Sequence, residues 1–246
     1  MRIGTSGWSY PSWKGTFYPV RTPPAKMLGL YSQTFTAVEA HSTHRQAPRG
    51  PALARWAEQV PDGFRFVAKA HAAITHRRDI EGTGERVSGF LDALGPLGDR
   101  MGPVLYVLPH LKPDLARLDL LLAAIGAGGG RPGGVLELGP QWWVDDVLDR
   151  LADVPAAALA VVDRDDPGTG GGPALDQPAL RRPAPGAVAY FRLRRAAYDE
   201  AGLDRWAERL ANEAAGGRDV YAFVKHDEHG DGPRYAHGLV SRLEGV

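Results

Sequence analysis

Residues Arg2–Pro19, RIGTSGWSYPSWKGTFYP, set the pattern that decides the fold. The stretch begins as a short strand-like run and continues into a loop, punctuated by Gly and Pro, that carries Ser6, Trp8, Tyr10 and Trp13. Large aromatic side chains directly after a strand are typical of a binding surface or of a lid over the core. Both interpretations are open from this stretch alone. A binding site is favoured because the same pattern, an apolar run followed by reactive side chains, recurs along the chain.

Seven further apolar runs follow, and most are separated by stretches with helical spacing. The strand-like runs cover residues 35–40, 64–69, 102–109, 134–138, 157–163, 186–193 and 219–225. Eight units in 246 residues, about 31 residues each, match an α/β fold of the TIM-like (β/α)8-barrel type. A doubly wound open sheet shares the alternation but rarely needs eight strands in so short a chain. No linker divides the sequence, so we predict a single domain over residues 1–246.

The composition excludes several classes of function. Lys and Arg together number 29, as do Asp and Glu, so no global field recruits nucleic acid or a membrane surface. The chain has no Cys and therefore no disulfide, thiolate metal site or Cys nucleophile. No apolar run approaches the ~20 residues of a membrane span, and we expect no leader before the first strand. We expect a cytoplasmic protein without a membrane partner, whose oligomeric state the sequence does not determine.

Polar side chains stand at the carboxyl ends of the predicted strands, where a barrel of this type builds its active site. Period-two geometry turns Glu39 and His41 the same way, and likewise Arg192 and Arg194. One such charge is more often an ion-pair partner or a helix cap, but groups that converge on one mouth shift each other's pKa values, as acid–base chemistry requires. Lys69 is notable because most basic residues here are Arg, and Lys suits a site that needs a lowered pKa.

Metal and nucleotide motifs are absent. Histidines and carboxylates at several strand ends leave a divalent metal open as an alternative, but no HExxH pair is present and a bound metal is not favoured. The sequence has no P-loop, no GxGxxG after a strand, no GxSxG elbow and no zinc-ribbon spacing. The sequence therefore specifies no cofactor.

Several motifs together resemble the domain of unknown function 72, or YecE-like, family. The matching segments include residues 3–10, 13–15, 38–39, 61–66, 69–70, 74–76, 102–103, 108–109, 192–193 and 219–227, so the resemblance extends over nearly the whole chain. It implies a TIM-like barrel and a shared set of polar strand-end residues, but no established reaction. The sequence departs from the family at residues 137–140, which read Glu-Leu-Gly-Pro where relatives usually read Glu-Phe-Arg-His. Arg45 or Arg194 could replace the missing Arg in space; equally, the ligand is changed or the site degraded.

Two functions follow from these observations. The favoured one is an enzyme that acts on a small polar or anionic, sugar-like or phosphorylated substrate, with a hydrolase, isomerase or lyase reaction unresolved. The alternative is a non-catalytic module that binds a nucleotide or nucleic acid through stacked aromatics and basic side chains. The expected catalytic residues are Glu39, Lys69, Glu137 and Asp163. The expected substrate-binding residues are Ser6, Trp8, Tyr10, Trp13, His41, Thr75, His76, Trp143, Arg192, Arg194, Lys225, His226 and Asp227.

Overall fold

Eight parallel strands form the centre of the molecule in the part of the chain that the structure describes. This computed structural model describes residues 1–46, 50–108, 114–127, 133–139, 142, 145–165, 187–225 and 229–244. The strands are β1 (Arg2–Thr5), β2 (Ala37–Ala40), β3 (Arg65–Ala68), β4 (Val104–Leu108), β5 (Gly134–Leu138), β6 (Ala157–Asp163), β7 (Val188–Leu193) and β8 (Asp219–Val224). Each lies within one of the predicted strand-like runs.

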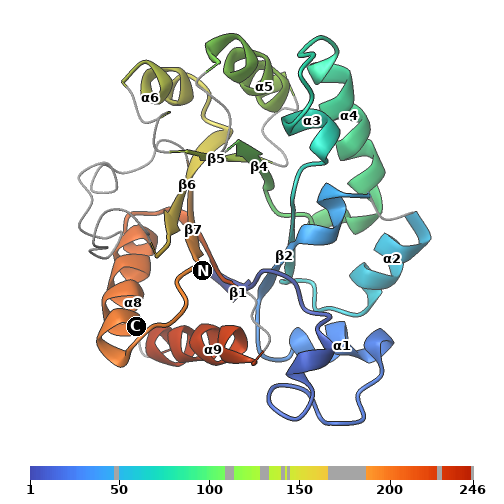
Figure 1. Cartoon of the computed structure of the whole chain (residues 1–246), viewed down its shortest axis with the longest axis vertical. Helices are drawn as coiled ribbons and strands as arrows, with labels where there is room; N and C mark the ends of the chain where they lie inside the picture. Colours follow the sequence, from blue (N-terminus) through green and yellow to red (C-terminus); the bar gives the residue numbers. More distant parts are fainter. Residues whose placement is uncertain are drawn as a thin grey trace.

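Helices surround the strands in Figure 1. The α-helices in the described residues are α1 (Pro24–Tyr31), α2 (Gly50–Glu58), α3 (Ala72–Thr75), α4 (Thr83–Leu94), α5 (Leu115–Ala127), α6 (Asp145–Ala152), α8 (Glu200–Ala215) and α9 (Asp231–Leu243). Three 3-10 helices are η1 (Pro11–Trp13), η2 (His41–His44) and η3 (Gly95–Arg100). The start of α8 has a clear local cause, since the Asp199 carboxylate accepts a hydrogen bond from the Gly202 N–H at 2.8 Å.

The hydrogen-bonded sheet is not closed. Six strands pair in the order β1-β8-β7-β6-β5-β4, and β2 pairs separately with β3; every one of these pairings is parallel. Isolated contacts cross the two gaps, such as the Thr36 N–H to the Ile3 oxygen at 3.2 Å and the Ala70 N–H to the Leu105 oxygen at 2.8 Å. The structure therefore shows a mixed α/β fold with a parallel sheet, and the described residues do not form the closed ladder of a (β/α)8 barrel.

Close approach explains one gap between strands. A Cβ atom on Gly4 would lie 1.9 Å from the Ala37 carbonyl oxygen, so only glycine lets β1 and β2 come this near. The Tyr31 hydroxyl fills the same region, where it accepts from the Thr5 N–H at 2.7 Å and donates to the Ala37 oxygen at 3.1 Å. A tyrosine from α1 thus provides contacts that a regular ladder would otherwise make.

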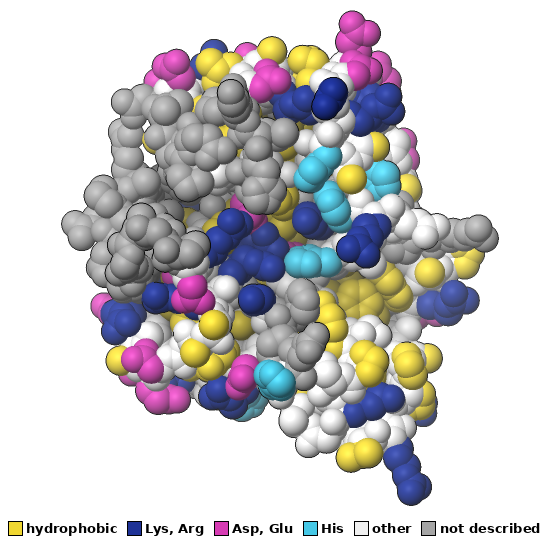
Figure 2. All heavy atoms as spheres, in the orientation of Figure 1, with side chains coloured by type: hydrophobic (Ala, Val, Ile, Leu, Met, Phe, Trp, Pro, Cys, Tyr) yellow, Lys and Arg dark blue, Asp and Glu magenta, His cyan; other side chains and the backbone are white. Residues whose placement is uncertain are grey.

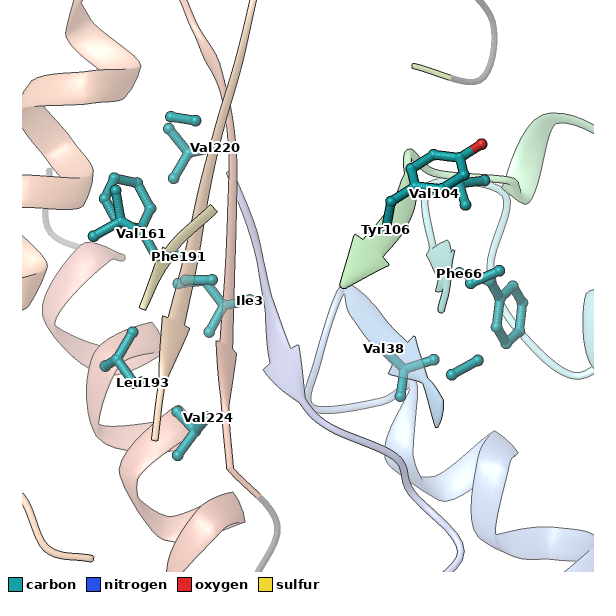
Figure 3. Packing of buried hydrophobic residues seen from close by; sticks show 14 of the residues in the cluster. Ile3, Val38, Phe66, Val104, Tyr106, Val161, Phe191, Leu193, Val220 and Val224 are labelled. Atoms are coloured by element: carbon teal, nitrogen blue, oxygen red, sulfur yellow. The ribbon is translucent and has the colours of Figure 1, made fainter. Parts of the chain in front are cut away.

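Alternation along the strands separates an inner from an outer apolar cluster. The inner cluster includes Ala37, Val67, Leu105, Val107, Val135, Ala158, Ala160, Tyr190, Tyr221 and Phe223. The outer cluster, which packs against the helices, includes Phe191, Leu193 and Val224, as Figure 3 shows. This division determines which strand-end side chains can meet in the interior.

Candidate functional site

Five of the predicted site residues follow inner positions of their strands. Glu39 comes two residues after Ala37, Lys69 after Val67, Glu137 after Val135 and Arg192 after Tyr190, and all four of these preceding residues belong to the inner cluster. Ser6 has the same alternation, because Gly4 is paired in register with the inner residue Phe223. Period-two geometry therefore turns these five side chains toward one another at the carboxyl ends of the strands.

Arg192 and Glu39 form the centre of the site. The Arg192 Nη2 atom lies 2.6 Å from Glu39 Oε1, and both side chains are buried. The Tyr190 hydroxyl donates to Glu39 Oε2 at 2.7 Å, the Ser6 hydroxyl donates to Oε1 at 3.0 Å, and the His41 Nε2 atom also contacts Oε1. Both oxygens of Glu39 are therefore occupied by donors, and the carboxylate is held in one orientation.

Glu137 pairs with the second terminal nitrogen of Arg192. Arg192 Nη1 pairs with Glu137 Oε2, while Arg164 Nη2 pairs with Oε1. Glu137 is buried, whereas the Arg164 side chain is about half exposed. We call Glu39, Arg192 and Glu137 the buried network; it joins the ends of β2, β7 and β5. Glu137 is thus bound by two arginines, Arg192 and Arg164, and neither is one of the two arginines expected to replace the missing family Arg.

Electrostatics fix the protonation of the buried network. Burial alone would raise the pKa of Glu39, but Arg192 and His41 outweigh it and hold that pKa well below its usual range. Burial would lower the pKa of Arg192, and Glu39 and Glu137 together raise it instead. Burial and the Glu39 charge raise the pKa of Tyr190 well above its ordinary value. Glu39 is therefore a carboxylate, and Tyr190 a neutral donor, at neutral pH.

Two further cations border the network without a carboxylate partner among the described residues. The Lys69 ammonium makes no hydrogen bond or ion pair with them, and the Arg194 Nη1 atom reaches only the Ser6 hydroxyl, at 3.3 Å. Burial lowers the pKa of both groups and the Arg192 charge lowers each further, while the charges of Glu39 and Glu137 offset only part of this. Figure 2 shows Lys, Arg and His side chains gathered in the middle of this face, over the strands. An anion placed here would relieve the mutual repulsion of these cations.

Tyr10 borders the Arg194 side of the site. Its hydroxyl donates to the Ser6 backbone oxygen at 2.7 Å. Burial raises the Tyr10 pKa to about 12, the Glu39 charge adds to this rise, and Arg194 opposes it. Tyr10 is only partly buried, so of the aromatic residues in the opening loop it is well placed to touch a ligand.

The histidines lie on the β2 and β3 side. His44 Nδ1 donates to the Ala70 oxygen at 2.8 Å, and its ring lies 5.1 Å from that of His76, measured between centroids. Thr75 is buried with its hydroxyl 2.7 Å from His76 Nδ1, and His76 is exposed. Among the described residues, no group of three or more His, Cys, Asp or Glu side chains is placed to hold a metal ion.

The two tryptophans of the opening loop belong to the core. Trp13 is fully buried and packs against Tyr10 and Tyr18. Trp8 is 9% exposed and meets the Trp56 ring edge-on at a centroid distance of 4.8 Å. The burial of Trp8 and Trp13 fits the interpretation of this loop as a lid over the core, and Ser6 and Tyr10 stay predicted binding residues.

Asp163 does not join the other predicted catalytic residues. It follows Val161, a member of the outer cluster, so it turns away from the interior and accepts from Trp206 Nε1 at 3.1 Å. It lines a separate cavity of about 470 Å³ beside α8. Asp165, Arg195, Ala196, Ala197, Tyr198, Asp199, Gly202, Arg205 and Trp206 line the same cavity.

The remaining predicted residues lie at the rim or outside the described chain. Lys225 is exposed, and its charge contributes to lowering the pKa of Asp165, after the larger effect of the Ala196 N–H. Trp143, His226 and Asp227 lie outside the described residues. Arg45, expected as a replacement for the missing family Arg, is exposed and accepts at its backbone oxygen from His71 Nε2 at 3.1 Å.

Two site residues were missed from the sequence. Tyr190 stands in the body of β7, where a hydroxyl in an apolar run signals a buried partner, and it shares the alternation of Arg192. Arg164 follows β6 directly and stands between Asp163 and Asp165 in the sequence. Its pairing with Glu137 depends on the proximity of β5 and β6, which are neighbouring strands of the sheet.

The fold and site together define an α/β protein whose parallel strands carry a buried Glu–Arg–Glu network at their carboxyl ends, bordered by cations. A family model described as "Protein of unknown function DUF72" matches residues 2–245. The chain belongs to this family, as its motifs predicted.

Relatives and solved structures agree with this membership. The UPF0759 protein YecE of Escherichia coli (strain K12) is 34% identical over 107 residues, which make up 44% of this chain and 37% of YecE. A DUF72 family protein from Enterococcus faecalis V583 matches with a TM-score of 0.78 at 18% identity, over 99% of this chain and 95% of that one. A DUF72 family protein from Thermotoga maritima MSB8 matches with a TM-score of 0.76 at 22% identity, over 99% of this chain and 98% of that one. These structural likenesses concern the fold, and none of the names states a reaction or a ligand.

Proposed function

We propose that this protein is an enzyme that binds a small anionic substrate, sugar-like or phosphorylated, at the carboxyl ends of its strands and acts on it by acid–base chemistry. The observation that carries the proposal is the presence of two half-buried cations, Lys69 and Arg194, without a carboxylate partner in the described chain. Cations that burial and mutual repulsion disfavour gain the most from a bound phosphate or carboxylate.

The roles within the site follow from protonation. Glu39 is ionised and engaged by Arg192, Ser6 and Tyr190, so it orients Arg192 and does not deliver a proton at neutral pH. Lys69 has a lowered pKa and no described partner, which suits a group that exchanges a proton with the substrate. Arg194 would hold the anionic group. The TIM-like barrel expected from the sequence is part of this proposal, because such barrels build their sites at this end of the strands.

The non-catalytic module receives less support. Nucleic-acid binding by stacking needs aromatic faces open to bases. Trp13 is buried, and Trp8 packs against Trp56.

No helix in the described residues is long and apolar enough to cross a membrane.

Ligand-dependent unfolding tests the proposal. We expect inorganic phosphate, and more strongly a sugar phosphate, to raise the unfolding temperature, since a ligand at 100 times its Kd adds ~2.7 kcal/mol of stability. Arg194→Met should abolish the shift, whereas Lys26→Met, an exposed control on α1, should retain it. Turnover is then followed by NMR over a panel of phosphorylated and carboxylated sugars, with Lys69→Met expected to stop it. The proposal is contradicted if phosphate raises the unfolding temperature of Arg194→Met and Lys26→Met equally, or if only oligonucleotides raise the unfolding temperature of the protein.

A further inference from the structure

We infer that Lys69 is a nucleophile that forms an imine with the carbonyl carbon of an anionic aldehyde or ketone. The inference rests on the proposed anion site and goes further, because it names the bond that forms and the substrate class. A lysine becomes nucleophilic when it is partly desolvated, or stands beside other cations, and is free of a carboxylate partner. Lys69 meets each of these conditions.

The backbone of Lys69 is held from two sides. Its N–H donates to the Ala40 oxygen at 3.2 Å, and the Thr43 hydroxyl donates to its carbonyl oxygen at 2.7 Å. The next residue, Ala70, donates its N–H to the Leu105 oxygen at 2.8 Å. The side chain therefore starts from a fixed point at the end of β3 and turns inward, as Val67 does two residues before it.

The nearby carboxylates are already engaged. Arg192 Nη2 and Tyr190 bind the two oxygens of Glu39, and Arg192 and Arg164 bind those of Glu137. The network thus leaves the ammonium of Lys69 without an ion pair among the described residues. Burial, and after it the Arg192 charge, lower the pKa of Lys69; Glu137 and Glu39 oppose this without cancelling it, so the fraction of neutral amine is increased.

A second cation that borders the buried network, Arg194, determines the substrate class. Arg194 has the Ser6 hydroxyl as its described partner, at 3.3 Å, and can receive a carboxylate or phosphate. A substrate that carries both an anionic group and a carbonyl would place the first at Arg194 and the second at Lys69. Compounds of this class include 2-oxo acids and phosphorylated aldehydes or ketones.

The chemical step is balanced without a co-reactant. The neutral amine of Lys69 attacks the carbonyl carbon, so a C–N bond forms as the C–O π bond breaks, and one proton moves from nitrogen to oxygen to give a carbinolamine. A second proton, from solvent, lets the hydroxyl leave as water while the nitrogen lone pair forms the C=N bond. Hydrolysis reverses both steps and restores the lysine.

Reductive trapping tests the inference on the intact chain. The protein is incubated with glyoxylate and cyanoborohydride at neutral pH, and the adduct is quantified by peptide mass mapping at each of the five lysines: 14, 26, 69, 112 and 225. We expect Lys69 to be labelled several-fold faster than exposed Lys26. Glycolaldehyde, an aldehyde without the charge, should show no such preference. Labelling of Lys69 no faster than that of the exposed lysines would overturn the inference.

Two controls connect the result to the site. Arg194→Met should remove the preference for Lys69 with glyoxylate while leaving the labelling of Lys26 unchanged. On the wild-type chain, which needs no variant to fold, saturating inorganic phosphate should slow labelling at Lys69 alone. If phosphate stabilises the protein through Arg194 but Lys69 is not trapped, the inference about the imine is wrong and the proposed function stands. If phosphate neither stabilises the protein nor protects Lys69, both the proposed anion site and the inference about the imine are wrong.

Discussion

Removal of Arg192 should be among the most damaging single changes in the site. Arg192 is 3% exposed, and its two terminal nitrogens bind two buried carboxylates, with Nη2 2.6 Å from Glu39 Oε1. Arg192→Met removes the cation and leaves Glu39 and Glu137 buried. Breaking one partner out of a buried ion pair costs about 3–5 kcal/mol. Because whole domains have about 5–15 kcal/mol of stability, we expect the variant to fold with a much smaller margin.

The loss of unfolding free energy in Arg192→Met should also depend on pH. In the wild type the pKa of Glu39 lies well below its ordinary value of 4.5. The ionised Glu39 therefore contributes fully to the free energy of unfolding above pH 4.5, and this contribution is lost as the pH falls through the folded-state pKa. Without Arg192, burial raises the Glu39 pKa, and the carboxylate takes up a proton at a higher pH. The difference in stability between variant and wild type should therefore be largest at neutral pH and shrink as the pH is lowered toward 4.5.

Urea unfolding followed by circular dichroism at several pH values measures this difference. Arg194→Met is the matched control, because Arg194 follows the same strand and its side chain has one described hydrogen bond, to the Ser6 hydroxyl. We expect the control to lose no more than about 1 kcal/mol. The reasoning is refuted if Arg192→Met loses less than about 1 kcal/mol at neutral pH, or if its deficit does not shrink in acid.

Three further substitutions test other parts of the structure, each by urea unfolding. Gly4→Ala would place a Cβ atom 1.9 Å from the Ala37 oxygen, so it should cost at least about 2 kcal/mol; a neutral result would contradict the close approach of β1 and β2. Trp206→Phe removes the donor to buried Asp163 and should cost about 1–3 kcal/mol, with no change in phosphate binding. Trp13→Ala should cost about 3–5 kcal/mol and leave the phosphate affinity of the folded fraction unchanged, whereas lost affinity would return Trp13 to the binding surface.

The strands could be found from the sequence because each is a buried apolar run with clear ends. The run at residues 157–163 coincides with β6, and that at 134–138 with β5. Closure of the sheet could not be found in this way. It depends on hydrogen bonds between particular neighbours, and at the β1–β2 gap Tyr31 from α1 makes contacts in place of a ladder.

The site was predictable within each strand but not between strands. Alternation relates Arg192 to Arg194, and Glu39 to the residues before it, without knowledge of any neighbour. Whether Asp163 faces inward depends on its register opposite Leu193, an outer residue, and the sequence carries no signal of that register. Roles were harder still, because the protonation of Glu39, one of the expected catalytic residues, depends on which cations reach its carboxyl group.

The open sheet gives the buried network a part in the order of folding. Arg192 and Glu39 lie 153 residues apart in the sequence, and within the described parts of the chain no ladder joins β2 and β3 to the six-stranded sheet. Contacts between such distant residues carry a high entropic cost of loop closure, so they form late. The ion pairs between Arg192 and the two glutamates can then couple the β2–β3 pair to the six-stranded sheet, so that both unfold as one cooperative unit. Selection on the chemistry of Glu39 and Arg192 would at the same time be selection on the cooperativity of unfolding, and native-state hydrogen exchange of β2 would report both.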